Sequence, residues 1–273
     1  MSKVICICNQ KGGTGKTTTA VNLSASLGEL GKKVLLVDID PQGNATSGVG
    51  VNKNELKSTI YDVIMHKTPI KEAVVHNVQE NLDLLPTNID LTGAEIELVG
   101  AISRETRLKR ALEEIKSQYD YILIDAPPSL SILTLNALVA SSYIMIPIQC
   151  EFYALEGVSQ LVSTIKLIKD NMNASLDIIG VLPTMADYRT NLTADVIKEL
   201  KSYFKEKVFE SIIPRNIRLS EAPSHGKPVI YYDSGSIGAK QYRELAKEFL
   251  NLKENRDAAS TAIPDQREHQ PAG

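Results

Sequence analysis

The segment that most constrains this chain is a glycine-rich loop, which begins directly after an apolar run at residues 4–8. The loop reads Gln10-Lys11-Gly12-Gly13-Thr14-Gly15-Lys16-Thr17-Thr18. A phosphate-binding loop follows the pattern G-x-x-x-x-G-K-[ST], whose first glycine would fall at position 10, where this chain has glutamine. The loop therefore fits the pattern in all but its first glycine. It also carries a second lysine, Lys11, at its entrance.

The residue types in this loop point to nucleotide phosphates. Glycines let successive backbone N–H groups turn inward to form a concave anion site, and the helix that follows adds the positive end of its dipole. We expect Lys16 to contact the β- and γ-phosphates, Thr17 to ligate Mg²⁺ and Thr18 to hold the α-phosphate. The alternative, a glycine-rich turn with two incidental lysines, is disfavoured because the loop lies between a strand and a helix.

Short apolar runs alternate along the chain with segments of helical periodicity. The runs that predict strands are Val4–Cys8, Val34–Val37, Leu82–Leu85, Tyr121–Ile124, Tyr143–Ile148 and Ile178–Pro183. Between the strands lie helical patterns, such as the apolar residues at positions 108, 111, 112 and 115. This alternation predicts a single-domain α/β fold with a mostly parallel, doubly wound sheet flanked by helices. With the phosphate-binding loop at its start, the expected fold is of the P-loop NTPase type. Ligands of such sheets bind at the carboxyl ends of the strands, where the glycine-rich loop falls.

Composition limits the domain organisation and the class of protein. No Pro/Gly/Ser-rich linker divides the 273 residues, so we expect one domain over residues 1–252 and a polar, disordered tail over 253–273. No apolar stretch reaches the roughly 18 residues of a membrane span, and the first residues predict a strand rather than a signal peptide. The expected location is therefore the cytoplasm. The cysteines Cys6, Cys8 and Cys150 are predicted core residues, not a disulfide framework or a metal site.

Three carboxylates follow two of the predicted strands. Asp125 comes directly after the run 121–124, as a Walker B carboxylate does near Mg²⁺. After the run 34–37, we assign Asp38 to the outer shell of the metal and Asp40 to the water that attacks the γ-phosphate. The alternatives are a helix or turn cap for Asp125 and a turn residue before proline for Asp40.

Together these motifs resemble the ParA/Soj family of DNA-segregation ATPases, within the MinD-like group of deviant Walker A proteins. The resemblance rests on the loop at 11–18, on Asp38-Ile39-Asp40-Pro41-Gln42-Gly43-Asn44 and on Asp125-Ala126-Pro127-Pro128. It continues through residues 149–157 and 214–224, and it covers about residues 1–252. The implied activity is hydrolysis of ATP to ADP and phosphate, with ATP and Mg²⁺ as cofactors.

The resemblance also implies how the site works. Two monomers would sandwich two ATP molecules, and Lys11 would cross the interface to the partner's nucleotide, so hydrolysis would be weak in the monomer. Lys11, Lys16 and Asp40 are the expected catalytic residues. The residues expected at the nucleoside are Pro214 and Asn216, at the adenine, and Glu151, at the ribose across the interface.

Family members of this type bind double-stranded DNA non-specifically as ATP dimers, and a ParB-like centromere-binding protein stimulates them. Residues 189–247 contain 11 Lys and Arg against 7 Asp and Glu, a local excess in a chain of net charge −3. The DNA-binding candidates are Arg189, Arg218, Lys198 and Lys201, with Lys205 on the same predicted helix face as the two other lysines. The alternative is an ordinary solvated helix face. We expect the protein to be nucleoid-associated, on either a chromosome or a plasmid.

Two other functions remain as alternatives. A MinD-like membrane-associated positioning ATPase would end in a basic amphipathic helix that docks on lipid. Here the last apolar stripe, Tyr242, Leu245, Ala246, Phe249 and Leu250, is predicted to pack on the body, so no membrane partner is expected. An iron–sulfur-cluster carrier would need cysteines at its interface, and it ranks last.

Overall fold

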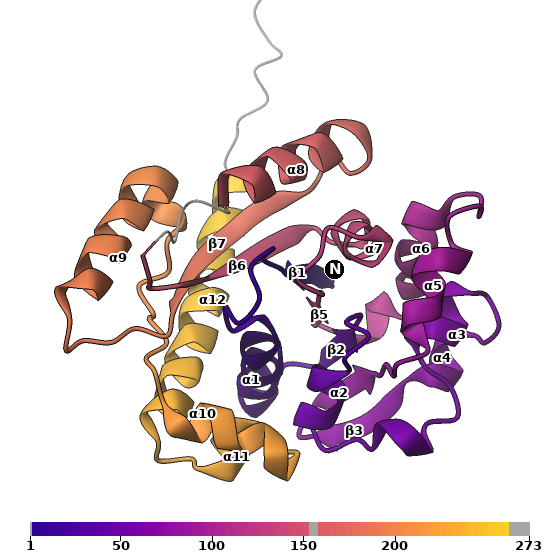
Figure 1. Cartoon of the computed structure of the whole chain (residues 1–273), viewed down its shortest axis with the longest axis horizontal. Coiled ribbons are helices and arrows are strands. Elements are labelled where there is room, and N and C mark those ends of the chain that lie inside the picture. Colours follow the sequence, from indigo (N-terminus) through magenta and orange to yellow (C-terminus); the bar gives the residue numbers. More distant parts are fainter. Residues whose placement is uncertain (1, 153–157, 262–273) are drawn as a thin grey trace, which may run out of the picture.

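A seven-stranded sheet runs through the described part of the chain. Figure 1 shows the computed structural model, which describes residues 2–152 and 158–261, with side chains as far as residue 252. The strands are β1 Lys3–Ile7, β2 Val34–Asp38, β3 Val75–Gln79, β4 Leu82–Leu85, β5 Tyr121–Asp125, β6 Tyr143–Gln149 and β7 Asp177–Thr184. Their order is β3-β4-β2-β5-β1-β6-β7, and every neighbouring pair is parallel except β3 with β4. The predicted mostly parallel α/β fold is confirmed.

All six predicted strands are present, with ends within one residue of the predicted ones. The antiparallel edge strand β3 was not predicted. Its sequence, Val-His-Asn-Val-Gln, is polar and partly exposed, its pairing with β4 is irregular, and Asn77 has a positive φ of 56°. An edge strand needs apolar residues on one face at most, so the sequence of β3 shows little of the apolar character of a buried strand and resembles that of a loop.

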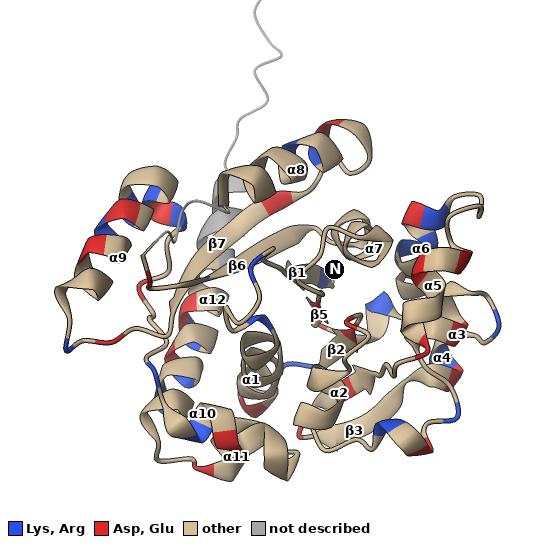
Figure 2. Cartoon of the chain, viewed as in Figure 1, with Lys and Arg blue, Asp and Glu red and all other residues tan. Residues whose placement is uncertain are grey.

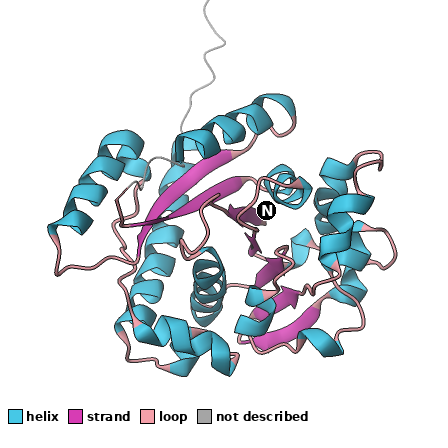
Figure 3. Cartoon of the chain, viewed as in Figure 1, coloured by secondary structure: helices cyan, strands magenta, loops and turns pink. Residues whose placement is uncertain are grey.

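Helices cover both faces of the sheet, so the fold has three layers (Figures 1 and 3). One face packs against α3 Ile60–Ile64, α4 Ile70–Ala73, α5 Leu91–Glu97, α6 Arg107–Glu113, α7 Ile132–Ala140, α8 Val158–Asn171 and α9 Asn191–Phe204. The other packs against α1 Lys16–Glu29, α2 Asn44–Gly48, α10 Ile217–Glu221, α11 Val229–Tyr232 and α12 Ile237–Thr261. Alternate strand residues feed the two cores: Cys6 and Ile124 face the first, while Ile5 and Leu123 face the second.

The long helix α12 lies along α1 and closes the second core. Its predicted apolar stripe is buried at Tyr242, Leu245, Ala246 and Phe249, each at most 1% exposed. The helix continues to Thr261, past the predicted domain boundary at residue 252. The rest of the predicted tail, residues 262–273, lies outside the described residues, so the boundary and the tail remain predictions.

Two smaller predictions concern packing. The three cysteines are buried and unbridged, as expected of core residues. The predicted helical stripe is mostly right: Leu108 and Leu112 are buried on α6, but the helix ends at Glu113, and the buried Ile115 lies beyond it. Within the residues that the structure describes, no helix has the length and apolar character needed to cross a membrane.

Candidate nucleotide-binding site

The glycine-rich loop joins the carboxyl end of β1 to the amino end of α1 in the middle of the sheet. Gly13 and Gly15 adopt left-handed conformations, with φ of 74° and 87°, which only glycine adopts without strain. At the loop entrance the Asn9 amide donates to the Pro147 carbonyl over 2.8 Å, and its oxygen accepts the Lys11 N–H. One buried hydrogen bond to the neighbouring strand β6 and one bond within the loop thus fix its entrance.

The two lysines of the loop occupy opposite environments. Lys16 is only 6% exposed, and its Nζ donates to the Lys11 carbonyl over 3.1 Å. Burial lowers the pKa of Lys16, and the charges of Asp125 and Asp40 partly oppose that shift. The Lys11 side chain is 52% exposed, and its Nζ lies 4.0 Å from a carboxylate oxygen of Glu151 in the same chain. One lysine is therefore held inside the site and the other stands at its mouth.

Two predicted metal ligands are adjacent because their strands are neighbours. Asp38 ends β2 and Asp125 ends β5, and the two are register partners in the parallel sheet, both fully buried. Asp38 accepts the N–H of Thr46 at 2.7 Å and its hydroxyl at 2.8 Å. Among the described residues, neither oxygen of Asp125 has a hydrogen-bond partner of normal geometry, although the nearby Thr17 hydroxyl favours its charged form.

The electrostatics of this pair suit a bound cation. Burial raises the pKa of Asp38 to about 6, against the stabilising hydrogen bonds from Thr46. Burial, and then the charge of Asp38, raise the pKa of Asp125 well above its usual range. When both are ionised, the two adjacent carboxylates carry two negative charges, and Lys16 supplies one positive charge. Asp125, in addition, has no hydrogen-bond donor of normal geometry among the described residues. Asp38, Asp125 and Thr17 therefore fit Mg²⁺, which prefers oxygen ligands.

Asp40 lies in the turn beyond β2 and is 8% exposed. Its Oδ1 accepts the Gln42 N–H over 3.0 Å, and its carbonyl accepts the Gly43 N–H over 2.8 Å. Asp40 is close enough for its charge to act on Lys16. Its charge thus reaches the lysine of the loop, and its expected role toward the attacking water stays a prediction.

A pocket of about 500 Å³ opens beside the loop and contains the two residues expected at the adenine. Its lining includes Gly15, Thr18, Thr184, Met185, Pro214, Arg215, Asn216 and Tyr242. The side-chain oxygen of Asn216 caps α10 by accepting the Arg218 N–H over 3.0 Å. Sequence reasoning did not assign Thr184, Met185, Arg215 or Tyr242 to this site. Thr184 directly follows a predicted strand, and Arg215 lies between the two residues expected at the adenine, so these two positions carried a signal.

Glu151, the residue expected at the ribose, joins this pocket to the loop entrance. Its carboxylate accepts the Arg215 guanidinium over 2.6 Å and lies 4.0 Å from Lys11 Nζ. Arg215 stands between Pro214 and Asn216 in the pocket wall. The fold thus brings Lys11, Glu151 and Arg215 together from three distant segments.

The DNA-binding candidates lie on or beside α9 and α10, two helices that stand apart in Figure 2, and α10 also lines the nucleotide pocket. Each arginine is paired within the chain: Arg189 with Asp187 at 2.6 Å, and Arg218 with Glu221 at 2.8 Å and Asp233 at 3.1 Å.

The three lysines of the predicted helix face differ. Lys201 is paired with Glu210 at 2.8 Å, and Lys198 is an exposed residue of α9. Lys205 does not belong to the helix face, because α9 ends at Phe204 and Lys205 has a φ of 52°. The prediction that all three lysines share one helix is wrong for Lys205.

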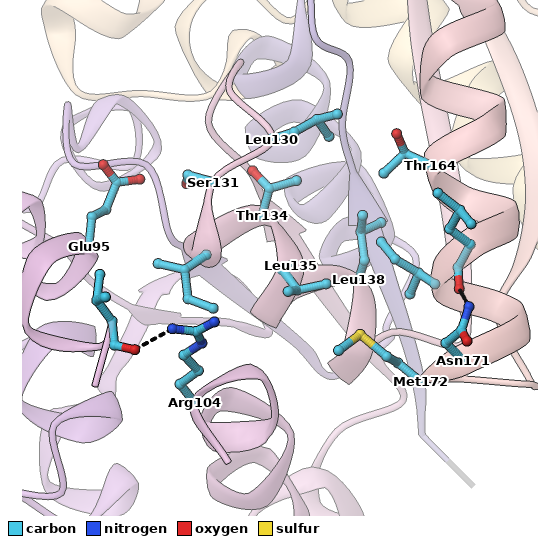
Figure 4. Close-up of a pocket in the computed structure, with 14 residues that line it drawn as sticks. Glu95, Arg104, Leu130, Ser131, Thr134, Leu135, Leu138, Thr164, Asn171 and Met172 are labelled. Atoms are coloured by element: carbon cyan, nitrogen blue, oxygen red, sulfur yellow. Dashed lines mark hydrogen bonds between the residues drawn. The ribbon is translucent and has the colours of Figure 1, made fainter. Parts of the chain in front are cut away.

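A larger hollow of about 670 Å³ lies away from this chemistry, between α5, α7 and α8. Figure 4 shows its mostly apolar walls, with Leu130, Leu135, Leu138 and Met172 around it and Glu95 and Arg104 at one side. The Arg104 guanidinium donates to the Val99 carbonyl. None of the predicted site residues lines this hollow, so it is separate from the nucleotide pocket.

Comparison with known proteins places these observations among relatives. A family model described as an AAA domain matches residues 2–178. The sporulation initiation inhibitor protein Soj of Bacillus subtilis (strain 168) is 58% identical over 248 residues, covering 91% of this chain and 98% of that protein. The chromosome partitioning protein ParA of Myxococcus xanthus (strain DK1622) is 51% identical over 250 residues, 92% of this chain and 88% of that protein.

A solved structure shares the fold and, in part, the sequence. It is a Mycobacterium smegmatis protein described as cobyrinic acid a,c-diamide synthase with bound ATP analog and magnesium. Its TM-score to this chain is 0.83 at 37% identity, covering 94% of this chain and 97% of that one. The ligands in that description are a nucleotide and the metal that the buried carboxylates here suit.

Proposed function

This chain belongs to the ParA/Soj family of partitioning ATPases, and from that premise we propose that it is an ATP-driven dimerisation switch that acts on DNA. ATP binding drives two copies into a sandwich dimer, and the dimer binds double-stranded DNA without sequence specificity. Hydrolysis, stimulated by a ParB-like centromere-binding protein, releases the DNA. The relatives named Soj and ParA support the partitioning role.

The observation that carries the proposal is the contrast between the two lysines of one loop. Lys16 is buried and points back into the loop, where its Nζ bonds the Lys11 carbonyl. Lys11 is half exposed, and within residues 2–152 and 158–252 the ion pair that it forms is the 4.0 Å contact with Glu151. An exposed cation at the mouth of a phosphate site can bind the nucleotide of a second copy, where negative charge builds up during phosphoryl transfer. Dimerisation would then complete the catalytic site.

Hydrolysis requires the carboxylates at the strand ends. Asp125, Asp38 and Thr17 would hold Mg²⁺, which supplies charge neutralisation on the phosphates. Asp40, in a turn fixed by the Gln42 N–H, would orient the attacking water. Asp38 bonds the Asp40 N–H over 3.2 Å, so the metal shell and the water-orienting turn share a hydrogen bond. Without the lysine of a second copy, this arrangement predicts weak turnover.

DNA binding would use the exposed cations Arg189, Arg218, Lys198 and Lys201. All four lie on or beside α9 and α10, and two-fold symmetry would double them in a dimer. Contacts from such side chains reach phosphates rather than bases, which gives binding without sequence preference and with strong salt dependence. The protein would then reside in the cytoplasm on the nucleoid.

The alternative, a MinD-like membrane-associated switch, meets a specific obstacle. The apolar face of α12, with Tyr242 and Phe249, is buried in the second core and is not available to lipid. A lipid-binding helix would have to be sought beyond residue 252. The two functions share the nucleotide site. They differ in whether ATP binding makes the protein bind DNA or a membrane.

One experiment tests the proposal against this alternative. Retention on non-specific duplex DNA and on anionic liposomes is measured with ATP, with ADP and without nucleotide, at about 50 and 200 mM salt. We expect retention on DNA only with ATP, weakening steeply at the higher salt, and none on liposomes. Nucleotide-independent retention on DNA, or ATP-dependent retention on liposomes alone, would reject the DNA-switch function.

The matched variant in this experiment is Lys11→Ala. We expect it to bind ATP within about threefold of the wild type, because the exposed side chain lies outside the loop interior. It should stay monomeric by light scattering and lose retention on DNA. Lys32→Ala, which changes another partly exposed lysine just beyond α1, is the control. A concentration-dependent ATP dimer of Lys11→Ala would remove Lys11 from the interface.

A further inference from the structure

A loop that turns its N–H groups toward a phosphate must turn some of its carbonyls toward the protein. A carbonyl buried in this way needs a donor, because an unpaired buried polar group is costly. Thr14 lies in the middle of the loop and is 1% exposed, and its carbonyl accepts the Thr184 hydroxyl over 2.9 Å. Thr184 is itself 1% exposed and comes from the end of β7, 170 residues away. One buried side chain from a distant strand thus satisfies the back of the loop.

Thr184 also lies beside Gly15, the N-cap of α1. Its Cγ2 lies 3.7 Å from the point where a β-carbon would stand on Gly15, which is ordinary packing distance. Gly15 has a left-handed conformation and is the N-cap of the helix whose dipole faces the phosphates. Thr184 therefore bonds Thr14 through its hydroxyl and lies next to the following loop residue, Gly15.

The backbone on either side of Thr184 is hydrogen-bonded to the loop that lines the adenine pocket. The Pro183 carbonyl accepts the Ile213 N–H over 2.9 Å, and the Ala186 N–H donates to the Ile213 carbonyl over 3.1 Å. Met185, between these bonds, has a φ of 52°, which is unusual for a residue with a β-carbon. Both Thr184 and Met185 line the pocket. The end of β7 thus joins the phosphate side of the site to its base side.

We propose that Thr184 is a positioning residue of the nucleotide site, whose hydroxyl holds the Thr14 carbonyl turned toward the protein and so keeps the loop shaped for phosphate. The proposal rests on the nucleotide site of the proposed function and adds a residue that the loop motif does not contain. In a protein without this hydroxyl, the Thr14 carbonyl of the empty loop turns away from its buried position. Phosphate binding must then return the carbonyl to that position without a hydrogen-bond donor, and the affinity for phosphate falls.

The test compares Thr184→Val, which removes the hydroxyl at nearly constant shape, with Thr184→Ser, which keeps it. Calorimetry measures the affinity of each for ATP with Mg²⁺ and for tripolyphosphate, a probe that has no base. We expect Thr184→Val to bind both ligands about tenfold more weakly and Thr184→Ser to bind both within about twofold of the wild type. Loss for both ligands in the valine variant, restored by serine, supports the proposal.

The control is Thr193→Val, which removes another buried hydroxyl bonded to a backbone carbonyl, that of Asp187 at 2.9 Å. It should leave both affinities unchanged. If Thr184→Val does not fold, Thr184→Ala and Thr184→Ser form the replacement pair, because they differ only in the hydroxyl oxygen.

Three results would overturn the proposal: wild-type affinities in Thr184→Val, an equal loss in Thr184→Ser, or a loss for ATP but not for tripolyphosphate. The last would place the effect on the base pocket alone. Failure of the proposed function is a separate result, since a wild type that binds ATP without hydrolysing it or binding DNA leaves the affinity comparison intact.

Discussion

The nucleotide site and the candidate DNA surface use charge in opposite ways. In the first, Lys16 is 6% exposed and Asp38 and Asp125 are fully buried, and the surrounding fold fixes their positions. In the second, the side chains of Arg189 and Arg218 are 87% and 47% exposed, and each is paired with an acidic residue of the same chain. The nucleotide site is therefore preorganised for its ligand. The arginines of the candidate DNA surface would have to leave their acidic partners to bind a phosphate.

This difference determines what each region can recognise. Buried groups cannot be resolvated easily, so they select a ligand of one geometry and charge. Exposed pairs contribute little to stability, and a phosphate that replaces the carboxylate partner gains a similarly modest energy. Affinity on that surface must therefore come from several weak contacts. We expect single changes to have large effects at the nucleotide site and small effects on the DNA surface.

The largest expected effect is that of Lys16→Ala. The variant removes the only cation buried among the phosphate-binding residues, so ATP affinity should fall at least a hundredfold. Calorimetry measures the affinity, and Lys166→Ala, an exposed lysine on α8, serves as the control. Retained affinity in Lys16→Ala would end the assignment of the loop.

Asp40→Ala should have the next largest effect, and we expect it to lower the rate of ATP hydrolysis rather than the affinity for ATP. Because Asp40 is proposed to orient the attacking water, its loss should slow hydrolysis about a hundredfold or more while ATP still binds, which would trap the dimer. Turnover of phosphate and the lifetime of the dimer by light scattering give the two readings. Asp90→Ala, an exposed carboxylate at the start of α5, is the control. Wild-type turnover in Asp40→Ala would remove this residue from the mechanism.

On the DNA surface, Arg189→Glu combined with Arg218→Glu should leave the ATP dimer intact and weaken DNA retention at least tenfold. The reason is that each substitution reverses a charge, and the dimer doubles the change. The slope of affinity against salt should also become shallower. Lys109→Glu combined with Arg110→Glu reverses the same charge on α6. Unchanged gel shifts at low salt in the arginine variant, or an equal loss in the α6 variant, would reject the surface.

The smallest expected effect, that of Asp187→Asn, tests most directly whether the cations of the DNA surface are held by acidic residues of the same chain. Hydrogen bonds from Arg189 hold the pKa of Asp187 far below its usual range, so this carboxylate is charged and would compete with the phosphates of the proposed DNA ligand. Asp187→Asn should release Arg189 and raise DNA affinity about twofold to fivefold. Glu113→Gln, which releases Lys116 near α6, makes the same charge change elsewhere. An equal gain in both variants would mean that net charge alone was responsible.

Much of the nucleotide site could be predicted because its signals are local. The spacing of glycines, Lys16 and Thr17 fixes a loop, and Asp38 and Asp125 mark the ends of two apolar strands. The edge strand β3 could not be predicted, because an exposed antiparallel strand has no buried face to impose a pattern. Lys205 was wrongly assigned to the helix for a related reason. The helical spacing of the lysines continues in the sequence past Phe204, but α9 ends there.

The sequence by itself determined the phosphate loop, the six parallel strands and the carboxylates that follow two of them, because residues near one another in the chain specify these features. Only the tertiary structure decided that Asp38 and Asp125 stand side by side, that Thr184 holds the Thr14 carbonyl, and that Glu151 lies between Lys11 and Arg215. These contacts depend on the order of strands in the sheet. That order follows from how the whole chain buries its two cores, and no local pattern encodes it.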